Sequence, residues 1–406
     1  MKQVVLTVAL CLVASVSFAQ KKVVKEALNL AKNSKKPNFT EARGLIKSAL
    51  ENAETKDQAN TWYVAGFIED QAFNAEKMKQ VLGQKPNEAA MYESLLNELP
   101  FFLKCYDLDH MPDKKGKIKP KNLKNTRNIL EANLVYYINA GAFYFDKQDY
   151  KGAYKSFSQY LEIVDHKMFV DTDVAKRDSN FMTVQFYAAV AAIQMKDRSL
   201  SIPALEKAKA TDFRRNDVYQ YLCYEYQQEK DTVMFEKTLE EGMKIFPKEN
   251  YYLLNLINNY VFSNRNEKAV EYLNKAISED ANNPQYYSVL GYVYEKGMND
   301  FVKAEENYNK ALSIDANYLE ALSNLGRIYY NQGVQKQSDA NMINDAKKYQ
   351  EELTVAKELF KKALPYFEKA HSLKADEMEY MIALRGIYYN LDMGDKLKEI
   401  EAKMNV

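Results

Sequence analysis

The residue types that carry metal or acid–base chemistry are few in this sequence and lie far apart along the chain. None of the three histidines, His110, His166 and His371, has a second ligand at the spacing of a zinc site, and no His-Glu-x-x-His motif occurs. Asp171 and Asp173 have the spacing of a metal pair, but the glycine and glutamate of a calcium loop do not follow, which favours a solvated linker. The sequence therefore predicts no metal and no cofactor.

Motifs for nucleophilic catalysis and for phosphate binding are also missing from the sequence. There is no Gly-x-Ser-x-Gly, no glycine-rich phosphate loop and no dinucleotide fingerprint. Because 28% of the residues are charged, pairs of carboxylates arise by chance and do not indicate an acid–base site. We predict a protein that is not an enzyme and has no catalytic residue; an enzyme with an unrecognised site is the less favoured alternative.

One stretch, residues 107–127, is strongly basic. Pro112, Gly116 and Pro120 predict a loop at least as far as residue 120. The basic side chains are Lys114, Lys115, Lys117, Lys119, Lys121, Lys124 and Arg127. They form either an anion-binding or partner-docking patch or a solvated lysine loop, and we favour the solvated loop because no aromatic residues interleave as they would for single-stranded nucleic acid. The formal net charge of +0 likewise argues against a nucleic-acid binder.

The elements that position these residues are set by an internal repeat that is clearest between Glu267 and Gly333. Two copies of one pattern lie there, with a period of about 34 residues, which is the period of a two-helix solenoid repeat. The paired positions are Leu290-Gly291 and Leu325-Gly326, Tyr294 and Tyr329, and Ala269/Ala276 and Ala304/Ala311. Ala208, Gly242 and Ala276 continue the same spacing, and Ala311 follows one residue late.

This pattern resembles the tetratricopeptide repeat family, in which each repeat pairs a helix A with a helix B. Tyr287, Leu290, Gly291 and Tyr294 match helix A, and Ala304, Tyr308 and Ala311 match helix B. Gly and Ala suit the points where the helices cross closely, and large neighbours fill the adjacent space. The resemblance implies an all-α fold, a right-handed superhelical solenoid of antiparallel helix pairs.

The chain divides by the regularity of this repeat. Residues 20–180 are divergent helical repeats that contain the basic loop at 107–127 and a polar connector at 167–180. Residues 181–406 are a regular array with a helical insertion at about 334–358. Within the last full repeat, Pro365 is expected to bend or restart the helix that contains it.

The N-terminal residues 1–19 have the features of a secretory signal peptide. Lys2 provides a positive start, an apolar core follows, and Ser17-Phe18-Ala19 predicts cleavage after Ala19. The apolar run is too short for a comfortable membrane span, so no transmembrane segment is expected after its removal. A lipoprotein anchored at Cys11 is less favoured, because Leu10 stands where a small residue is needed. The sequence resembles exported proteins of Bacteroidota, which implies a periplasmic location.

The other cysteines, Cys105 and Cys223, form no Cys-x-x-Cys motif. In the repeat register, Cys105 lies on a helix B and Cys223 on a distant helix A. Since repeats in a solenoid contact only their neighbours, we predict two free, buried thiols.

In the family that the chain resembles, helix A lines the concave groove where partners bind. The register places the following residues on that groove: Gln220, Tyr224, Tyr251, Asn258, Phe262, Tyr292, Arg327 and Tyr330. Tyrosine and arginine are enriched at binding hot spots. The repeated Tyr260, Tyr294 and Tyr329 are assigned instead to the core.

One subfamily clamps a C-terminal carboxylate with lysine, asparagine and arginine side chains from successive A helices. Leu254 and Ser288 occupy the positions where that clamp requires lysine, so a clamp of this type is not expected here. The resulting prediction is a scaffold or adaptor of the cell envelope that binds proteins or peptides of the envelope in its groove. A periplasmic protein that binds glycans or small ligands is the alternative.

Overall fold

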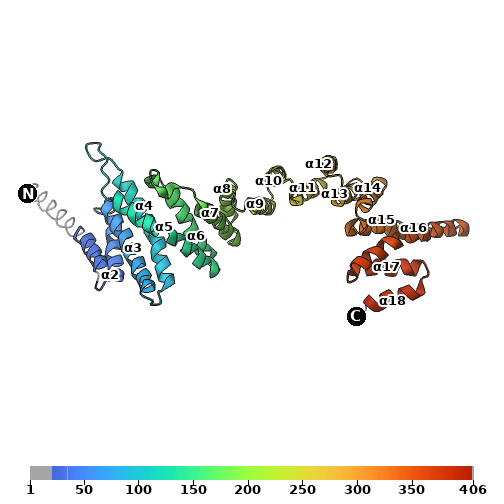
Figure 1. The fold of residues 1–406 in the computed structure, drawn as a ribbon, viewed down its shortest axis with the longest axis horizontal. Helices are drawn as coiled ribbons and strands as arrows, with labels where there is room; N and C mark the ends of the chain where they lie inside the picture. Colours follow the sequence, from blue (N-terminus) through green and yellow to red (C-terminus); the bar gives the residue numbers. More distant parts are fainter. Residues whose placement is uncertain (1–20, 34, 405–406) are drawn as a thin grey trace, which may run out of the picture. The chain divides into compact units, whose positions relative to one another are not determined.

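The computed structural model describes residues 21–33 and 35–404, and within these ranges it consists of helices and turns without a strand (Figure 1). The predicted signal peptide and Cys11 lie outside the described residues. The chain forms two compact units, residues 1–235 and 236–406, which are described separately. This division reflects packing rather than repeat regularity, so the sequence-based boundary at residue 180 stays a prediction. No described helix combines the length and the apolar character needed to cross a bilayer.

Unit 1 is a series of helices in which each one packs on the next along the chain. Residues 21–32 are helical. They are followed by α2 (Phe39–Glu51), α3 (Ala59–Val81), α4 (Glu88–Asp109), α5 (Leu123–Asp146), α6 (Tyr150–Asp165), the short η1 (Lys167–Phe169) and η2 (Asp173–Ala175), α7 (Ser179–Gln194), α8 (Arg198–Ala208) and α9 (Arg215–Glu229). The next helix, α10 (Thr232–Ile245), contains the boundary between the units.

Unit 2 continues the alternation of helix A and helix B. Its elements are α11 (Asn250–Phe262), α12 (Asn266–Glu279), α13 (Pro284–Tyr292), the π-helical turn η3 (Val293–Gly297), α14 (Phe301–Ile314), α15 (Leu319–Ala340), α16 (Ala346–Leu373), α17 (Met378–Asn390) and α18 (Gly394–Met404). The odd-numbered helices from α11 are A helices and the even-numbered ones are B helices. The predicted insertion lengthens α15 and α16, and α16 runs through Pro365 as one helix, so the expected restart at that proline was wrong.

The turn from helix A to helix B is built in the same way in several repeats. The second residue before the new helix adopts a left-handed conformation, with φ of 57° at Lys196, 62° at Lys230 and 54° at Asn299. An aspartate follows and caps helix B; the Asp300 carboxylate, for example, accepts the backbone N–H of Lys303 at 3.1 Å. Such a cap satisfies an N–H that has no partner within the helix, so a very short turn suffices.

Glycine on helix A makes room for an aromatic ring from helix B of the same repeat. A Cβ atom placed on Gly66, Gly141, Gly291 or Gly326 would lie 2.7, 2.1, 2.8 or 3.0 Å from the ring of Phe102, Phe157, Tyr308 or Phe367, respectively. The three contacts below 3.0 Å are too short for a packed interior, and at Gly326 the Phe367 ring would have to shift. The Leu-Gly signature therefore records the close crossing of the two helices, as the sequence predicted.

The tyrosine near the end of helix A connects successive repeats. Its hydroxyl donates to a glutamate on the preceding helix B in the pairs Tyr226–Glu206 (2.8 Å), Tyr260–Glu236 (3.1 Å), Tyr329–Glu305 and Tyr388–Glu368 (3.1 Å). Tyr260 and Tyr329 are buried, which confirms their assignment to the core, and the partly buried Tyr294 packs against the core of unit 2.

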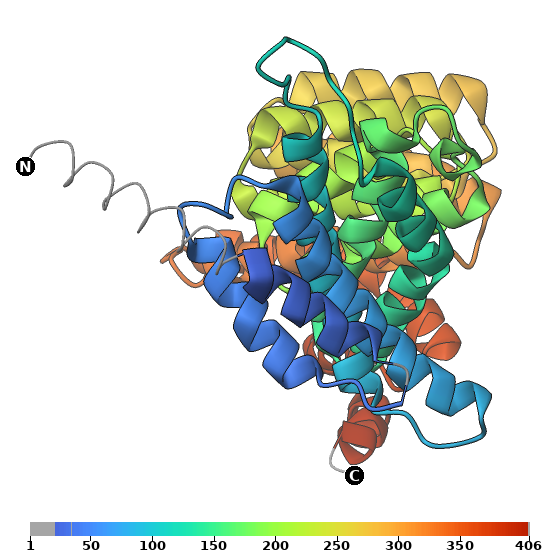
Figure 2. The ribbon, with the colours of Figure 1, turned by 90° about the vertical axis from the view of Figure 1, so that its left-hand side faces the viewer.

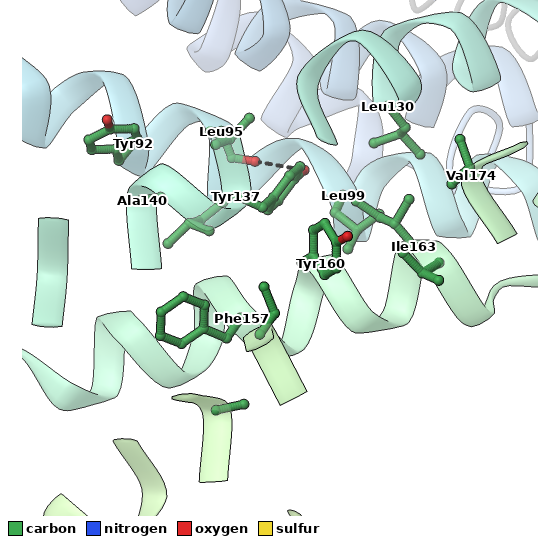
Figure 3. Close-up of a cluster of buried hydrophobic side chains, with 14 of the residues drawn as sticks. Tyr92, Leu95, Leu99, Leu130, Tyr137, Ala140, Phe157, Tyr160, Ile163 and Val174 are labelled. Atoms are coloured by element: carbon green, nitrogen blue, oxygen red, sulfur yellow. Dashed lines mark hydrogen bonds between the residues drawn. The ribbon is translucent and has the colours of Figure 1, made fainter. Parts of the chain in front are cut away.

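The core of unit 1 brings together side chains from α4, α5 and α6 (Figure 3). Tyr137 on α5 lies at its centre and donates a hydrogen bond to the carbonyl oxygen of Leu95 at 3.2 Å. The segment 167–180 joins this core through Met168, Phe169 and Val174, which are all buried. The prediction of a polar connector was therefore wrong, because three apolar side chains among its polar residues fold back onto α5 and α6.

Candidate functional site

The predicted groove residues on α11 and α13 include large side chains that are open to solvent. Phe262 is 87% exposed and Tyr292 is 37% exposed. Asn258 is also exposed, whereas Tyr251 is partly buried and packs edge-on against Tyr252. Exposed aromatic rings at corresponding faces of successive helices are unusual on a surface that contacts only water. They make the A helices of unit 2 the candidate interaction surface.

Arg327 on α15 is also a predicted groove residue, but its guanidinium already forms an ion pair within the protein. It forms a two-pronged ion pair with Glu295, with Nη1–Oε1 and Nη2–Oε2 distances of 2.7 and 3.1 Å. Nη2 also donates to Asn324 Oδ1 at 2.9 Å. The Arg327 side chain is only 24% exposed. Arg327 therefore cannot offer a free cation to a ligand unless this pair opens.

Glu295 reaches Arg327 because it lies in the π-helical turn η3. Asn266 on α12 holds that turn by donating its Nδ2–H to the carbonyl oxygen of Gly297 at 2.8 Å. Tyr308 donates its hydroxyl to Glu295 at 3.0 Å. Burial works to raise the pKa of Glu295, but the bonds from Arg327, Lys296 and Tyr308 outweigh it, and the net shift in pKa is downward. The pair is thus ionised at neutral pH and fixes η3 against α15.

Tyr330, the other predicted groove residue on α15, is packed within the repeat stack. Its ring meets Phe360 of α16 edge-on, with centroids 5.7 Å apart. A Cβ atom on Gly386 of α17 would lie 2.4 Å from the Tyr330 hydroxyl oxygen. This tyrosine therefore contributes mainly to the contact between neighbouring repeats and is only partly open to a ligand.

Gln220 and Tyr224, the remaining predicted positions, lie on α9 in unit 1. Tyr224 is half exposed and Gln220 is partly buried. Tyr224 is thus an exposed A-helix side chain of unit 1. Since the two units are described separately, neither residue is part of the surface of unit 2.

Sequence reasoning missed two exposed side chains on α17. Tyr389 is 69% exposed and Ile382 is 51% exposed. The sequence Gly-Ile-Tyr-Tyr-Asn at residues 386–390 repeats four of the five residues of Arg-Ile-Tyr-Tyr-Asn at 327–331. This similarity places Tyr389 at the repeat position of Tyr330, so the repeat pattern could have identified it. The helix-A face of unit 2 is defined below by these residues: Asn258, Phe262, Tyr292, Arg327, Ile382 and Tyr389.

Unit 1 contains a cavity of about 480 Å³ between α6, α7 and α8. Its lining includes Tyr154, Glu162, His166, Lys207 and Gln185 of α7. The Gln185 side chain is 9% exposed, and its Oε1 atom has no hydrogen-bond partner among the described residues. Burial and the positive charge of Lys167 lower the pKa of His166, so its ring is neutral at neutral pH. The cavity can therefore hold a small polar molecule that donates a hydrogen bond.

A buried polar cluster in unit 1 joins α3, α4 and α5. Asn133 donates to Asp70 at 3.0 Å and to Glu98 at 3.1 Å, and Tyr137 donates to Glu98 at 3.0 Å. Burial, followed by the charge of Asp70, raises the pKa of Glu98 well above its ordinary value. No described cation forms an ion pair with either acid, so the surroundings favour the protonated, neutral form of Glu98. The cluster is enclosed and serves the packing of the three helices.

The thiols of Cys105 and Cys223 are free and buried, which confirms their prediction. Burial raises the pKa of each to about 12, so neither is a nucleophile at neutral pH. Among the described residues, no group of three or more histidines, cysteines or acids is placed to bind a metal ion.

Two segments match known repeat families. Residues 255–283 match the tetratricopeptide repeat, and residues 298–333 match the family described as TPR repeat. These ranges coincide with most of α11 and α12 and with α14 and the first part of α15. The fold is therefore all-helical over its described residues and contains tetratricopeptide repeats, as the resemblance implied. No curated protein sequence matches the chain.

Several solved structures are similar to parts of this chain. A TPR repeats protein from Bacteroides fragilis is 20% identical, with 63% of this chain and 98% of that chain covered and a TM-score of 0.33. The C-terminal part of a TPR repeat-containing protein from Cytophaga hutchinsonii is 15% identical, with coverages of 65% and 98% and a TM-score of 0.36. YrrB, described as a TPR protein with an unusual peptide-binding site, is 14% identical, with coverages of 50% and 97% and a TM-score of 0.33.

Proposed function

We propose that this tetratricopeptide repeat protein is a non-enzymatic scaffold that binds segments of partner proteins on the helix-A face of unit 2. The observation that carries the proposal is the exposure of Phe262, Tyr292, Ile382 and Tyr389 at A-helix positions. Burial of a large apolar side chain against a partner contributes a large favourable free energy to binding. Aromatic residues also dominate the binding energy of many protein interfaces.

The ion pair between Arg327 and Glu295 restricts the chemistry of the bound segment. The acid neutralises the arginine, and a ligand carboxylate would have to displace it from a bidentate geometry at 2.7 and 3.1 Å. Leu254 and Ser288 provide no alternative cation at the positions where a carboxylate clamp needs one. The face therefore suits a segment that offers apolar side chains rather than an acidic C-terminus.

The location within the cell envelope is part of the proposal and rests on residues 1–19, whose sequence has the features of an export signal. With that signal removed, the scaffold would work in a periplasm and its partners would be envelope proteins. Detection of the protein in the periplasmic fraction, cleaved after Ala19, tests this point. Retention of residues 1–19 in the isolated protein would refute it.

The binding surface is tested by recovery of partners from the protein's own cells. The variant Phe262→Ala/Tyr292→Ala/Tyr389→Ala should lose partners that the wild type retains after crosslinking, since hot-spot truncations cost about 2 kcal/mol or more each. Phe301→Ala is the matched control, because Phe301 is an exposed ring on the helix B α14. Equal recovery with the triple variant and the wild type would remove the helix-A face from the function.

A second candidate function, binding of a glycan or another small polar ligand, is favoured by the cavity at Gln185. A buried amide oxygen without a partner is costly, and a ligand hydroxyl would satisfy it. A ligand that binds only the folded state raises the melting temperature. Thermal stabilisation by a glycan panel should then disappear in Gln185→Leu; a panel without any stabilising compound would leave the scaffold as the function.

A further inference from the structure

The loop between α4 and α5, residues 110–122, is an ordered basic projection that the scaffold function does not use. Figures 1 and 2 show it extending beyond the ends of both helices. Asp113 organises its tip: the carboxylate accepts the backbone N–H groups of Lys115 and Lys117 at 2.8 and 2.9 Å. Gly116, at φ 74°, provides the left-handed residue of this turn. We call residues 110–122 the lysine loop.

The acids in and beside the lysine loop are occupied by other groups. Asp113 is bound to the loop backbone, and Asp109 accepts the backbone N–H of Asn122 at 2.6 Å. Asp107 lies 4.0 Å from Lys167. As a result, none of the loop lysines forms an ion pair with a described residue; these are Lys114, Lys115, Lys117, Lys119 and Lys121. The loop thus concentrates positive charge on a chain whose net charge is +0.

Two large apolar side chains lie in the same loop. Met111 is 58% exposed and Ile118 is 55% exposed. Ile118 lies between Lys117 and Lys119 in the sequence, so an apolar group is surrounded by positive charge. Amphipathic combinations of this kind bind the boundary between lipid headgroups and acyl chains.

We propose that the lysine loop docks the protein onto a bilayer that contains anionic lipids. Its cations are all lysines, whose strongly hydrated point charges suit a diffuse layer of lipid phosphates. A defined carboxylate or phosphate is bound better by the planar fork of arginine, which the loop lacks. The loop also has no aromatic ring for stacking on nucleic-acid bases. Each lysine near an anionic surface contributes about a fivefold gain in binding.

Vesicle sedimentation tests the proposal with the chain from Gln20 onward, which includes every described residue. This protein should bind vesicles of 30% phosphatidylglycerol in phosphatidylcholine and should bind pure phosphatidylcholine far more weakly. Its binding to the anionic vesicles should weaken as the salt concentration increases. Lys115→Ser/Lys117→Ser/Lys119→Ser should bind about a hundredfold more weakly, from about fivefold per lysine. The corresponding triple Lys→Arg variant should retain binding to the anionic vesicles.

The control variant Lys25→Ser/Lys47→Ser/Lys151→Ser removes the same charge from exposed helical positions of unit 1. It should bind as the wild type does, and an equal loss in both variants would refute a specific role of the loop. Ile118→Ser should weaken binding at every salt concentration, because it removes the apolar contact. Absence of binding to anionic vesicles overturns the proposal. Lysine-dependent binding to polyglutamate without vesicle binding would also overturn it, and would assign the loop to an acidic protein partner.

Discussion

Replacing Glu98 with glutamine should stabilise unit 1 at neutral and alkaline pH. The wild-type carboxyl is fully buried on α4, accepts hydrogen bonds from Asn133 and Tyr137, and lies in the field of Asp70 without a cation. Burial and Asp70 raise the pKa of Glu98, so the folded protein keeps a proton that the unfolded chain releases. Glutamine retains an oxygen that accepts the same hydrogen bonds and never carries charge.

The expected magnitude follows from proton linkage. Below the unfolded pKa of glutamate, about 4.3, both states are protonated and Glu98 adds no pH dependence. Above that pH the unfolded chain binds fewer protons than the folded protein, so stability falls as pH rises toward the folded pKa. The slope approaches about 1.4 kcal/mol per pH unit for one proton. Glu98→Gln should lack this contribution.

Trp62 on α3 provides the measurement, because it is the single tryptophan of the chain and its ring lies 6.2 Å from Phe101 of α4. Its fluorescence follows urea unfolding of the helices that enclose Glu98. From about pH 5 up to the folded pKa of Glu98, the stability of Glu98→Gln relative to wild type should increase with pH, with a slope that approaches about 1.4 kcal/mol per pH unit. Glu93→Gln, at an exposed position of α4, is the control and should follow the wild type. Parallel pH curves for Glu98→Gln and wild type would refute this reasoning.

Three further predictions concern packing, charge and thiols. Gly141→Ala places a methyl group 2.1 Å from the Phe157 ring and should destabilise unit 1 by about 1–3 kcal/mol or more, which a lower melting temperature would show. Gly44→Ala is the control and should not lower the melting temperature, because no atom lies within 4 Å of its added methyl group. Arg327→Gln leaves the Glu295 carboxylate buried without its main partner and should cost about 3–5 kcal/mol in unit 2; a smaller loss at acidic pH, where Glu295 is protonated, would show that charge is the cause. Both buried cysteines should be unreactive toward a thiol reagent in the folded chain and titrate fully in denaturant.

The helices and their pairing were predictable because each depends on local sequence. The spacing of apolar residues fixes the helical faces, and Gly291 and Gly326 mark the crossing points that their aromatic partners confirm. The helix caps are also local, since Asp300 lies three residues before the N–H that it accepts. The restart expected at Pro365 does not occur: α16 continues through this proline. A proline within a long helix removes one hydrogen bond, and the packing of α16 against α15 offsets that cost.

The candidate surface was predictable only in part, because exposure depends on what the next repeat supplies. The register placed Tyr292 and Tyr330 equally well on the groove, yet Tyr292 meets solvent whereas Tyr330 meets the small Gly386 of α17. Tyr389, at the equivalent position of the next A helix, is 69% exposed. A repeat pattern thus defines equivalent positions, but the residue facing each position decides whether it can bind a partner.

The ion pair at the centre of the helix-A face has a visible origin in the sequence. Ala311 follows Ala276 one residue later than the regular spacing, and the structure shows a π-helical turn, η3, between them. A π turn accommodates one more residue than an α turn, and such turns are frequent at functional sites. Here it brings Glu295 to Arg327. The additional residue in η3 therefore both interrupts the repeat spacing and places the acid that neutralises Arg327. Under the proposed function, this neutralisation favours apolar partner segments over a carboxylate.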